Sequence, residues 1–150
     1  MSEKICFFIG HRDAPASLYP ALLQEVERHI GLYGVRQFLV GHYGAFDRLS
    51  ARAVLAAKKA HPGLALFLLL PYHPAERPVS LPAGFDGAYY PPGMERVPRR
   101  MAIARANRAA VDGASYLIAY AVHAASNARA LTEYARRREA RGLITVTALP

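Results

Sequence analysis

Residues 35–59, VRQFLVGHYGAFDRLSARAVLAAKK, decide the predicted fold. The apolar run that ends at Val40 is typical of a strand buried on both faces. Gly41 and Gly44 predict a tight turn in which the backbone comes close to a ligand. Asp47 lies at the start of an alanine-rich helix, whose N-terminus favours negative charge. The stretch therefore predicts a strand, a glycine turn and a helix that together form a nucleotide-type pocket.

Strands and helices alternate along the rest of the chain. Strands are expected at 4–9, 35–40, 64–70, 116–120 and 143–148, and the helices outside the opening stretch at 17–30, 98–111 and 126–141. Residues 71–96, rich in proline and glycine, are interpreted as a mobile flap beside the pocket, with a short strand near 88–90. The alternation predicts one α/β domain over 1–150, a doubly wound, mainly parallel, Rossmann-like sheet with helices on both faces.

Composition fits a single cytoplasmic domain. A chain of 150 residues with 53% hydrophobic content can bury a full core. The longest apolar run, 64–70, is too short to span a membrane, and the N-terminus lacks a signal-peptide pattern. The one cysteine, Cys6, lies inside the first strand, which excludes an intrachain disulfide and fits a reducing cytoplasm.

The net charge of +8 favours anionic ligands without requiring nucleic acid. Much of this charge comes from arginines spread over helices, as at 136–138, where a run of like charges is usually a solvated face. Aromatic residues are not interleaved with the basic ones, so nucleic acid is not an expected partner.

In open α/β sheets, ligands bind at the carboxyl ends of the strands. Four of the six histidines follow predicted strand ends, and nearby tyrosines offer stacking surfaces for a base. The alternative is that these side chains have no ligand and form hydrogen bonds with backbone groups in turns. No HxxxH, HxH or CxxC spacing supports a metal, and no cofactor is expected. The candidate binding residues at the strand ends are Gly10, His11, Arg12, Gly41, His42, Tyr43, Gly44, Asp47, Tyr72, Tyr120, Ser126 and Asn127.

Four segments carry a resemblance to a known family: FFIGHRDAP (7–15), GHYGAFDRLSARAVLAAKK (41–59), LPYHP (70–74) and ANRAAVDGASYLIAY (106–120). Together they resemble the YpsA-like branch of the SLOG superfamily, which is Rossmann-like and includes LOG-type nucleoside-monophosphate phosphoribohydrolases. The resemblance implies a nucleotide or nucleotide-derived ligand at the strand ends and a homodimer.

Carried over by position, the resemblance assigns further residues. Residues 10–12 match the family's GHR turn, and residues 41–47 match its glycine turn and aspartate. Asn107 and Asp112 match an RN…VD pattern whose arginine is displaced to Arg105. The largest departure is at residues 123–128, where a Gly-Gly-x-Gly-Thr phosphate loop is usual and this chain has no glycine.

The missing glycines weaken the predicted phosphate cradle, although Ser126 and the helix N-terminus still suit an anion. Glu133 matches a catalytic glutamate by resemblance, or it is a surface partner of Arg129 or Arg137 at helical spacing.

Two functions follow. The favoured one is a nucleotide-binding sensor or adaptor. The alternative is a phosphoribohydrolase in which Arg12 or Arg105 holds the phosphate, Asp47 holds the ribose hydroxyls, and Glu133 or Asp112 assists cleavage of the N-glycosidic bond.

Overall fold

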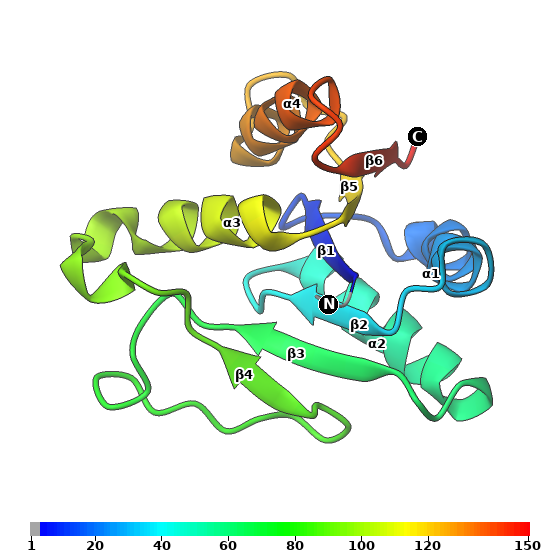
Figure 1. The fold of residues 1–150 in the computed structure, drawn as a ribbon, viewed down its shortest axis with the longest axis horizontal. Coiled ribbons are helices and arrows are strands. Elements are labelled where there is room, and N and C mark those ends of the chain that lie inside the picture. Colours follow the sequence, from blue (N-terminus) through cyan, green and yellow to red (C-terminus); the bar gives the residue numbers. More distant parts are fainter. Residues whose placement is uncertain (1–3) are drawn as a thin grey trace.

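The computed structural model describes residues 4–150. Residues 1–3, which belong to the N-terminal stretch predicted to lack a signal-peptide pattern, lie outside the described part. Six parallel strands form one sheet in the order β4-β3-β2-β1-β5-β6 (Figure 1). The strands are β1 (Ile5–Gly10), β2 (Gln37–Val40), β3 (Ala65–Leu69), β4 (Gly87–Tyr89), β5 (Tyr116–Tyr120) and β6 (Thr145–Ala148). The predicted doubly wound parallel sheet is confirmed.

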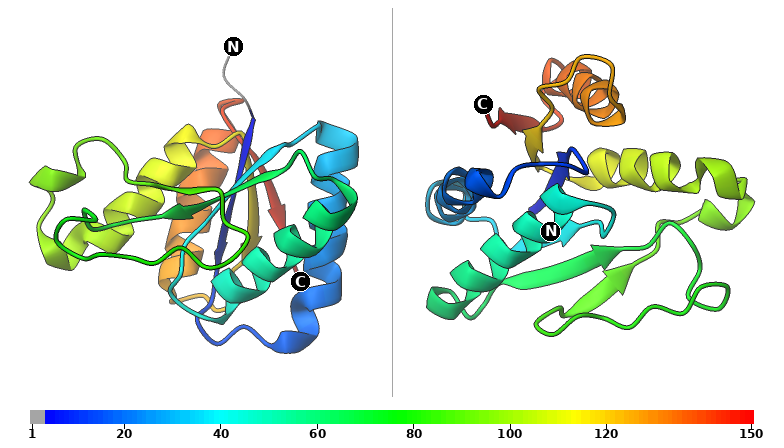
Figure 2. Two further views of the ribbon diagram at one scale, coloured as in Figure 1. Left: turned by 90° about the horizontal axis from the view of Figure 1, so that it is seen from below. Right: turned by 180° about the vertical axis from the view of Figure 1, so that it is seen from behind.

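Two pairs of helices cover the two faces of the sheet, with α1 and α2 on one side and α3 and α4 on the other (Figure 2). Each layer has its own apolar core, because alternate residues of a strand point to opposite faces. On β1, Phe8 packs with the α1–α2 layer, whereas Phe7 packs with the α3–α4 layer. The helices are α1 (Tyr19–Tyr33), α2 (Ala45–Ala60), α3 (Ala102–Gly113) and α4 (Asn127–Glu139).

Helix α1 begins and ends later than the sequence predicts. A short 3-10 turn over Ala16–Leu18 precedes it, and Pro20 lies in its first turn, where a missing N–H is tolerated. The helix ends at Tyr33 and is capped by Gly34, whose φ of +72° belongs to the left-handed region that glycine adopts without strain.

The short strand predicted near residues 88–90 is present as β4 (Gly87–Tyr89). Strand β4 pairs with β3, and Asp86 accepts hydrogen bonds from Lys58 Nζ at 2.7 Å and from the backbone N–H of Leu66 at 2.9 Å. Met94, in the 3-10 turn Met94–Arg96, is buried in the core. Residues 71–86 contain no helix or strand, whereas residues 87–89 belong to the sheet and residues 94–96 form a 3-10 turn, so the proline- and glycine-rich segment is attached to the domain from Asp86 onward.

Within residues 4–150, none of the helices is long and apolar enough to cross a lipid bilayer.

Candidate functional site

The connectivity of the sheet reverses at β1, which lies between β2 and β5. Ligands of open α/β sheets bind at such a switch point, beyond the carboxyl ends of the strands. A cleft of about 710 Å³ opens there and continues between α3 and α4; we call it the strand-end cleft. Its lining includes ten of the predicted binding residues: Gly10, His11, Arg12, Gly41, Tyr43, Asp47, Arg105, Asn107, Ser126 and Asn127.

Gly10 is needed for packing at the base of this cleft. A Cβ atom placed on it would lie 2.2 Å from Cγ of Phe46, a fully buried side chain of α2. The absence of a side chain therefore lets β1 and α2 approach each other, which fixes where both of their adjoining loops lie.

His11 joins the loop after β1 to the loop after β5. Its Nε2 accepts the backbone N–H of His123 at 3.2 Å, so the ring is neutral and carries its proton on Nδ1. Burial, followed by the neighbouring His123, lowers the pKa of His11 and keeps this form. The ring also packs edge-on against Tyr120, with 5.3 Å between centroids. His11 therefore positions the rim of the cleft.

The N-terminus of α2 does not offer the anion site that the glycine turn predicts. The backbone N–H of Ala45 donates to the carbonyl of Arg12 at 2.8 Å, and that of Phe46 donates to the carbonyl of His11 at 3.3 Å. Gly44 has a φ of +122°, and a Cβ on it would lie 2.6 Å from Cα of Arg12. The loop after β1 therefore lies against the glycine turn and occupies the position that was predicted for a phosphate.

Asp47 lies on the wall of the cleft and holds the turn together. Its Oδ2 accepts the backbone N–H of Tyr43 at 3.1 Å and faces Gly41, where a Cβ would lie 2.9 Å away. Burial raises the pKa of Asp47 to about 6, against the smaller opposing effect of the Tyr43 hydrogen bond. Such a raised pKa in a cleft is typical of functional carboxylates.

Helix α4 provides the N-terminus that α2 lacks. Ser126 caps it as predicted: its hydroxyl accepts the N–H of Arg129 at 3.1 Å and donates to the carbonyl of His123 at 2.8 Å. Within residues 4–150 the backbone N–H groups of Asn127 and Ala128 have no hydrogen-bond partner. These amides are placed at the cleft, where they suit an anion.

Four arginines line the strand-end cleft, and only two of them are predicted from the sequence. Arg12 and Arg105 are the predicted residues, whereas Arg100 and Arg108 are additional. None of the four has an ion-pair partner in the described part of the chain, and Asp47 is the only carboxylate on the lining. Arg108 could have been identified from the sequence, because Arg105 and Arg108 are three residues apart on the predicted helix 98–111 and so share one face.

Four predicted binding residues lie outside this lining. Gly44 packs against the loop after β1. The ring of Tyr120 stacks on that of Phe46, with 6.2 Å between their centroids. Tyr72 donates its hydroxyl to the carbonyl of Arg99 at 3.4 Å. His42 is exposed and its ring stacks on that of Tyr43, with 4.3 Å between centroids.

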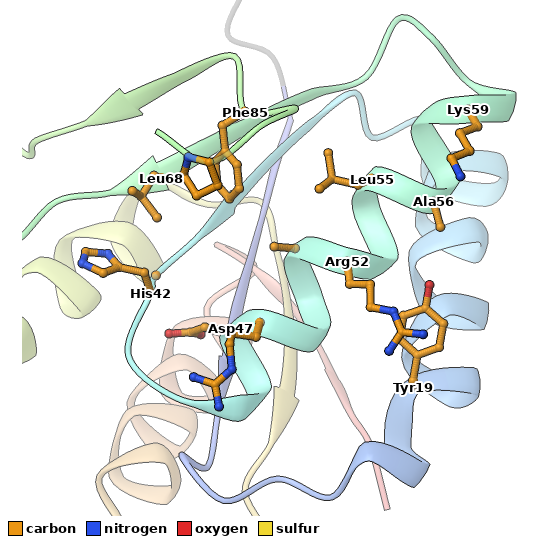
Figure 3. Close-up of a pocket in the computed structure, with 13 residues that line it drawn as sticks. Tyr19, His42, Asp47, Arg52, Leu55, Ala56, Lys59, Leu68 and Phe85 are labelled. Atoms are coloured by element: carbon orange, nitrogen blue, oxygen red, sulfur yellow. The ribbon is translucent and has the colours of Figure 1, made fainter. Parts of the chain in front are cut away.

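His42 belongs instead to a second hollow of about 530 Å³ beside α2, which we call the α2 groove. In Figure 3, His42, Leu68 and Phe85 lie on one side of it and Tyr19 and Arg52 on the other. The guanidinium of Arg52 lies over the ring of Tyr19 at 4.2 Å. The two hollows share Gly41 and Asp47.

Neither proposed catalytic carboxylate lines the strand-end cleft or the α2 groove. Glu133 is exposed on α4, with its Oε2 3.7 Å from Nε of Arg129, the surface pairing that the sequence offered as an alternative. Asp112 lies near the end of α3, where Oδ1 accepts the hydroxyl of Tyr134 at 2.5 Å and is 3.4 Å from Nε of Arg138. Asp112 therefore acts on the cleft only through Tyr134, which does line it.

Residues 4–150 contain no group of three or more His, Cys, Asp or Glu side chains that could hold a metal ion. The sequence matches no protein-family model, and no curated protein is significantly similar to it.

Proposed function

We propose that this chain binds a nucleotide or another phosphate-bearing small molecule in the strand-end cleft and acts as a sensor or adaptor. One observation carries the proposal: arginines without ion-pair partners and the amides of Asn127 and Ala128, within residues 4–150, line one cleft at the switch point of the sheet. Guanidinium groups and helix N-termini are the groups that recognise phosphate.

In this proposal the parts of the cleft have different tasks. Arg12 and Arg105 contact the phosphate, as the two carry full charge at any physiological pH. Tyr43 lines the same cleft and presents a ring to a base, and Asn107 presents an amide. Asp47 holds the turn before α2 and faces the ribose hydroxyls.

A calorimetric titration with adenosine and uridine 5′-monophosphates tests the proposal. We expect binding to the unmodified chain and a loss of about tenfold in affinity in Arg12→Gln or Arg105→Gln, because each variant loses charge-assisted hydrogen bonds. Arg141→Gln, an exposed position beyond α4 and outside the cleft, is the matched control. Equal affinity in all four proteins, or no binding at all, would contradict the proposal.

A second candidate, the phosphoribohydrolase, is favoured by one observation. Asp47, with a pKa of about 6, lies in the cleft and suits proton transfer near neutral pH. Release of free base from the same monophosphates tests it. Loss of that release in Asp47→Asn, with Glu133→Ala and Asp112→Asn unaffected, would support an enzyme that uses Asp47.

We also propose that the chain belongs to the YpsA-like branch of the SLOG superfamily, acts in the cytoplasm and forms a homodimer. The placement of residues 10–12 around one rim with Gly41, Tyr43 and Asp47 supports the family assignment. Light scattering on the eluting chain measures the oligomeric state, and a monomer at micromolar concentration would contradict the dimer.

A further inference from the structure

The strand-end cleft does not stop at the strand ends. It continues between α3 and α4, over Ile103 and Leu131, as far as Arg108 and Tyr134. Along α4 the distance from Asn127 to Tyr134 is seven residues, or about 10 Å at the helical rise per residue. The cleft is therefore longer than a single phosphate requires.

The far end of the cleft is held in place by hydrogen bonds and ion pairs. Tyr134 donates its hydroxyl to Asp112, and Arg138 lies 3.4 Å from the same carboxylate and donates to the carbonyl of Asp112 at 3.3 Å. The guanidinium of Arg108 lies over the ring of Tyr134 at 4.4 Å. Stacking covers one face of a guanidinium and leaves its N–H groups, which lie in the plane, directed outward.

The charge of Arg108 is not neutralised by its surroundings. Within residues 4–150 no carboxylate lies within ion-pair distance of it, because Asp112 is paired with Arg138 instead. The cleft as a whole presents Arg12, Arg100, Arg105 and Arg108 against Asp47. A phosphate monoester carries a charge of roughly −1.5 to −2 at pH 7, which leaves positive charge unmatched.

We propose that the cleft binds a small molecule with two separated anionic groups, one at the strand ends and the second at Arg108 beside Tyr134. This inference rests on the proposed function and specifies its ligand class: a nucleotide-type molecule with phosphates at two separate positions. The groups at the strand ends, which form the mouth of the cleft, bind the first phosphate. Helices α3 and α4 enclose the body of the ligand, and Arg108 binds the second phosphate.

Three probes distinguish the effect of the number of phosphates on affinity from the effect of their spacing. Adenosine 5′-monophosphate has one phosphate, adenosine 5′-triphosphate has adjacent phosphates, and adenosine 3′,5′-bisphosphate has two separated ones. We expect the bisphosphate to bind at least about tenfold more tightly than the monophosphate, as an added charge-assisted pair allows. In Arg108→Gln that gain is lost while the monophosphate affinity changes less than about twofold.

Arg137→Gln is the matched control. Arg137 also lies near the ring of Tyr134, at 5.8 Å, but does not line the cleft, so both affinities should stay unchanged. Far-UV circular dichroism and a thermal melt verify that each variant is folded.

The outcomes distinguish this inference from the proposed function. If the monophosphate binds and the bisphosphate binds no more tightly, or if Arg108→Gln keeps the gain, the second anion position is wrong and the proposed function stands. If the triphosphate gains affinity and loses it in Arg12→Gln but not in Arg108→Gln, the extra charge is bound at the mouth, and the inference is also overturned. If none of the three probes binds, the proposed function itself fails.

Discussion

Gly10 illustrates how a single atom determines the shape of the strand-end rim. The ring of Phe46 occupies the volume that any larger residue at position 10 would need. Because close-packed interiors yield little, an added methyl group must displace α2 or β1. Gly10 is therefore part of the site through backbone packing, although it lines the cleft among residues with polar side chains.

Gly10→Ala is expected to lower the free energy of unfolding by about 1–3 kcal/mol, the usual range for overpacking a core. Gly31→Ala is the matched control, since Gly31 lies inside α1 and has nothing within 4 Å of an added Cβ. That variant should gain about 0.5–1 kcal/mol from helix propensity. Urea unfolding measures both values, and equal effects in the two variants would contradict the packing argument.

Asp47 makes the stability depend on pH. Its pKa is about 6 in the folded chain, against an ordinary value of 3.8, so the folded state takes up the proton more readily than the unfolded state. The contribution of Asp47 therefore becomes more favourable as pH falls from above 6 towards 3.8. A difference of this size corresponds to about 3 kcal/mol as an upper value.

Asp47→Asn should be more stable than the unmodified chain by about 1–3 kcal/mol at pH 8, because the amide oxygen still accepts the N–H of Tyr43 and no charge is buried. The difference should shrink as pH falls through 6 towards 4. Denaturant unfolding of both proteins between pH 4 and 8 tests this. Subtracting one free energy of unfolding from the other at each pH removes the contribution of histidine titration, which both proteins share. A difference that does not vary with pH would contradict the raised pKa.

Strand β4 shows how side-chain contacts hold a short strand that its own residues predict only weakly. Only three residues long, it is attached to β3 by a short ladder and by Asp86, whose pKa is lowered by the hydrogen bond from Lys58 and then by that from Leu66. Proline and glycine in 71–96 correctly predict irregular chain up to residue 86, and the short strand predicted near 88–90 is formed. The sequence pattern does not show that Asp86 joins this strand to Lys58 of α2 and Leu66 of β3, which lie 28 and 20 residues away in sequence.

Asp86→Ala should lower the free energy of unfolding by about 1–2 kcal/mol, the range for two charge-assisted hydrogen bonds that are partly exposed. Asp86→Asn is the control, because it keeps an acceptor for the N–H of Leu66 and loses the ion pair with Lys58. Hydrogen exchange of β4 should accelerate strongly in the alanine variant and weakly in the asparagine variant. Identical exchange in both would show that Asp86 does not hold the strand.

The whole chain carries a net charge of +8, and within residues 4–150 four arginines without ion-pair partners line the strand-end cleft against one carboxylate, that of Asp47. Salt screens the attraction between exposed opposite charges, whereas the backbone hydrogen bonds of the parallel sheet and the packing of its two apolar cores do not depend on such charges. The molecule therefore combines a rigid scaffold with a ligand site whose strength depends on ionic strength.

Inorganic phosphate should raise the midpoint of thermal unfolding more than sodium chloride at the same ionic strength. At ten times the dissociation constant the expected stabilisation is about 1.4 kcal/mol, which corresponds to roughly 3–6 °C for a domain of this size. The double variant Arg12→Gln and Arg105→Gln should lose this difference. Scanning calorimetry measures it, and an equal response to the two salts would contradict specific phosphate binding.

The alternation of apolar strands with amphipathic helices was sufficient to predict the doubly wound parallel sheet, because hydrophobic periodicity is local and short connections leave few topologies. It also predicted the cap at Ser126, since a side chain that bonds an amide three residues on needs no distant partner. Residues 10–12 and 126–127 converge on one rim with Gly41, Tyr43 and Asp47, because the carboxyl ends of parallel strands share one edge of the sheet.

The tertiary structure decided which groups at that rim remain free. The turn after β2 has the glycines of an anion site, yet the carbonyls of His11 and Arg12 occupy its amides. Arg108 becomes part of the cleft because α4 brings Tyr134 beneath it, and Asp112 is withdrawn into an ion pair with Arg138. Sequence patterns determine which elements form, because each element depends on its own residues. The partners of a polar group depend on neighbours brought together by folding, so they are settled only in three dimensions.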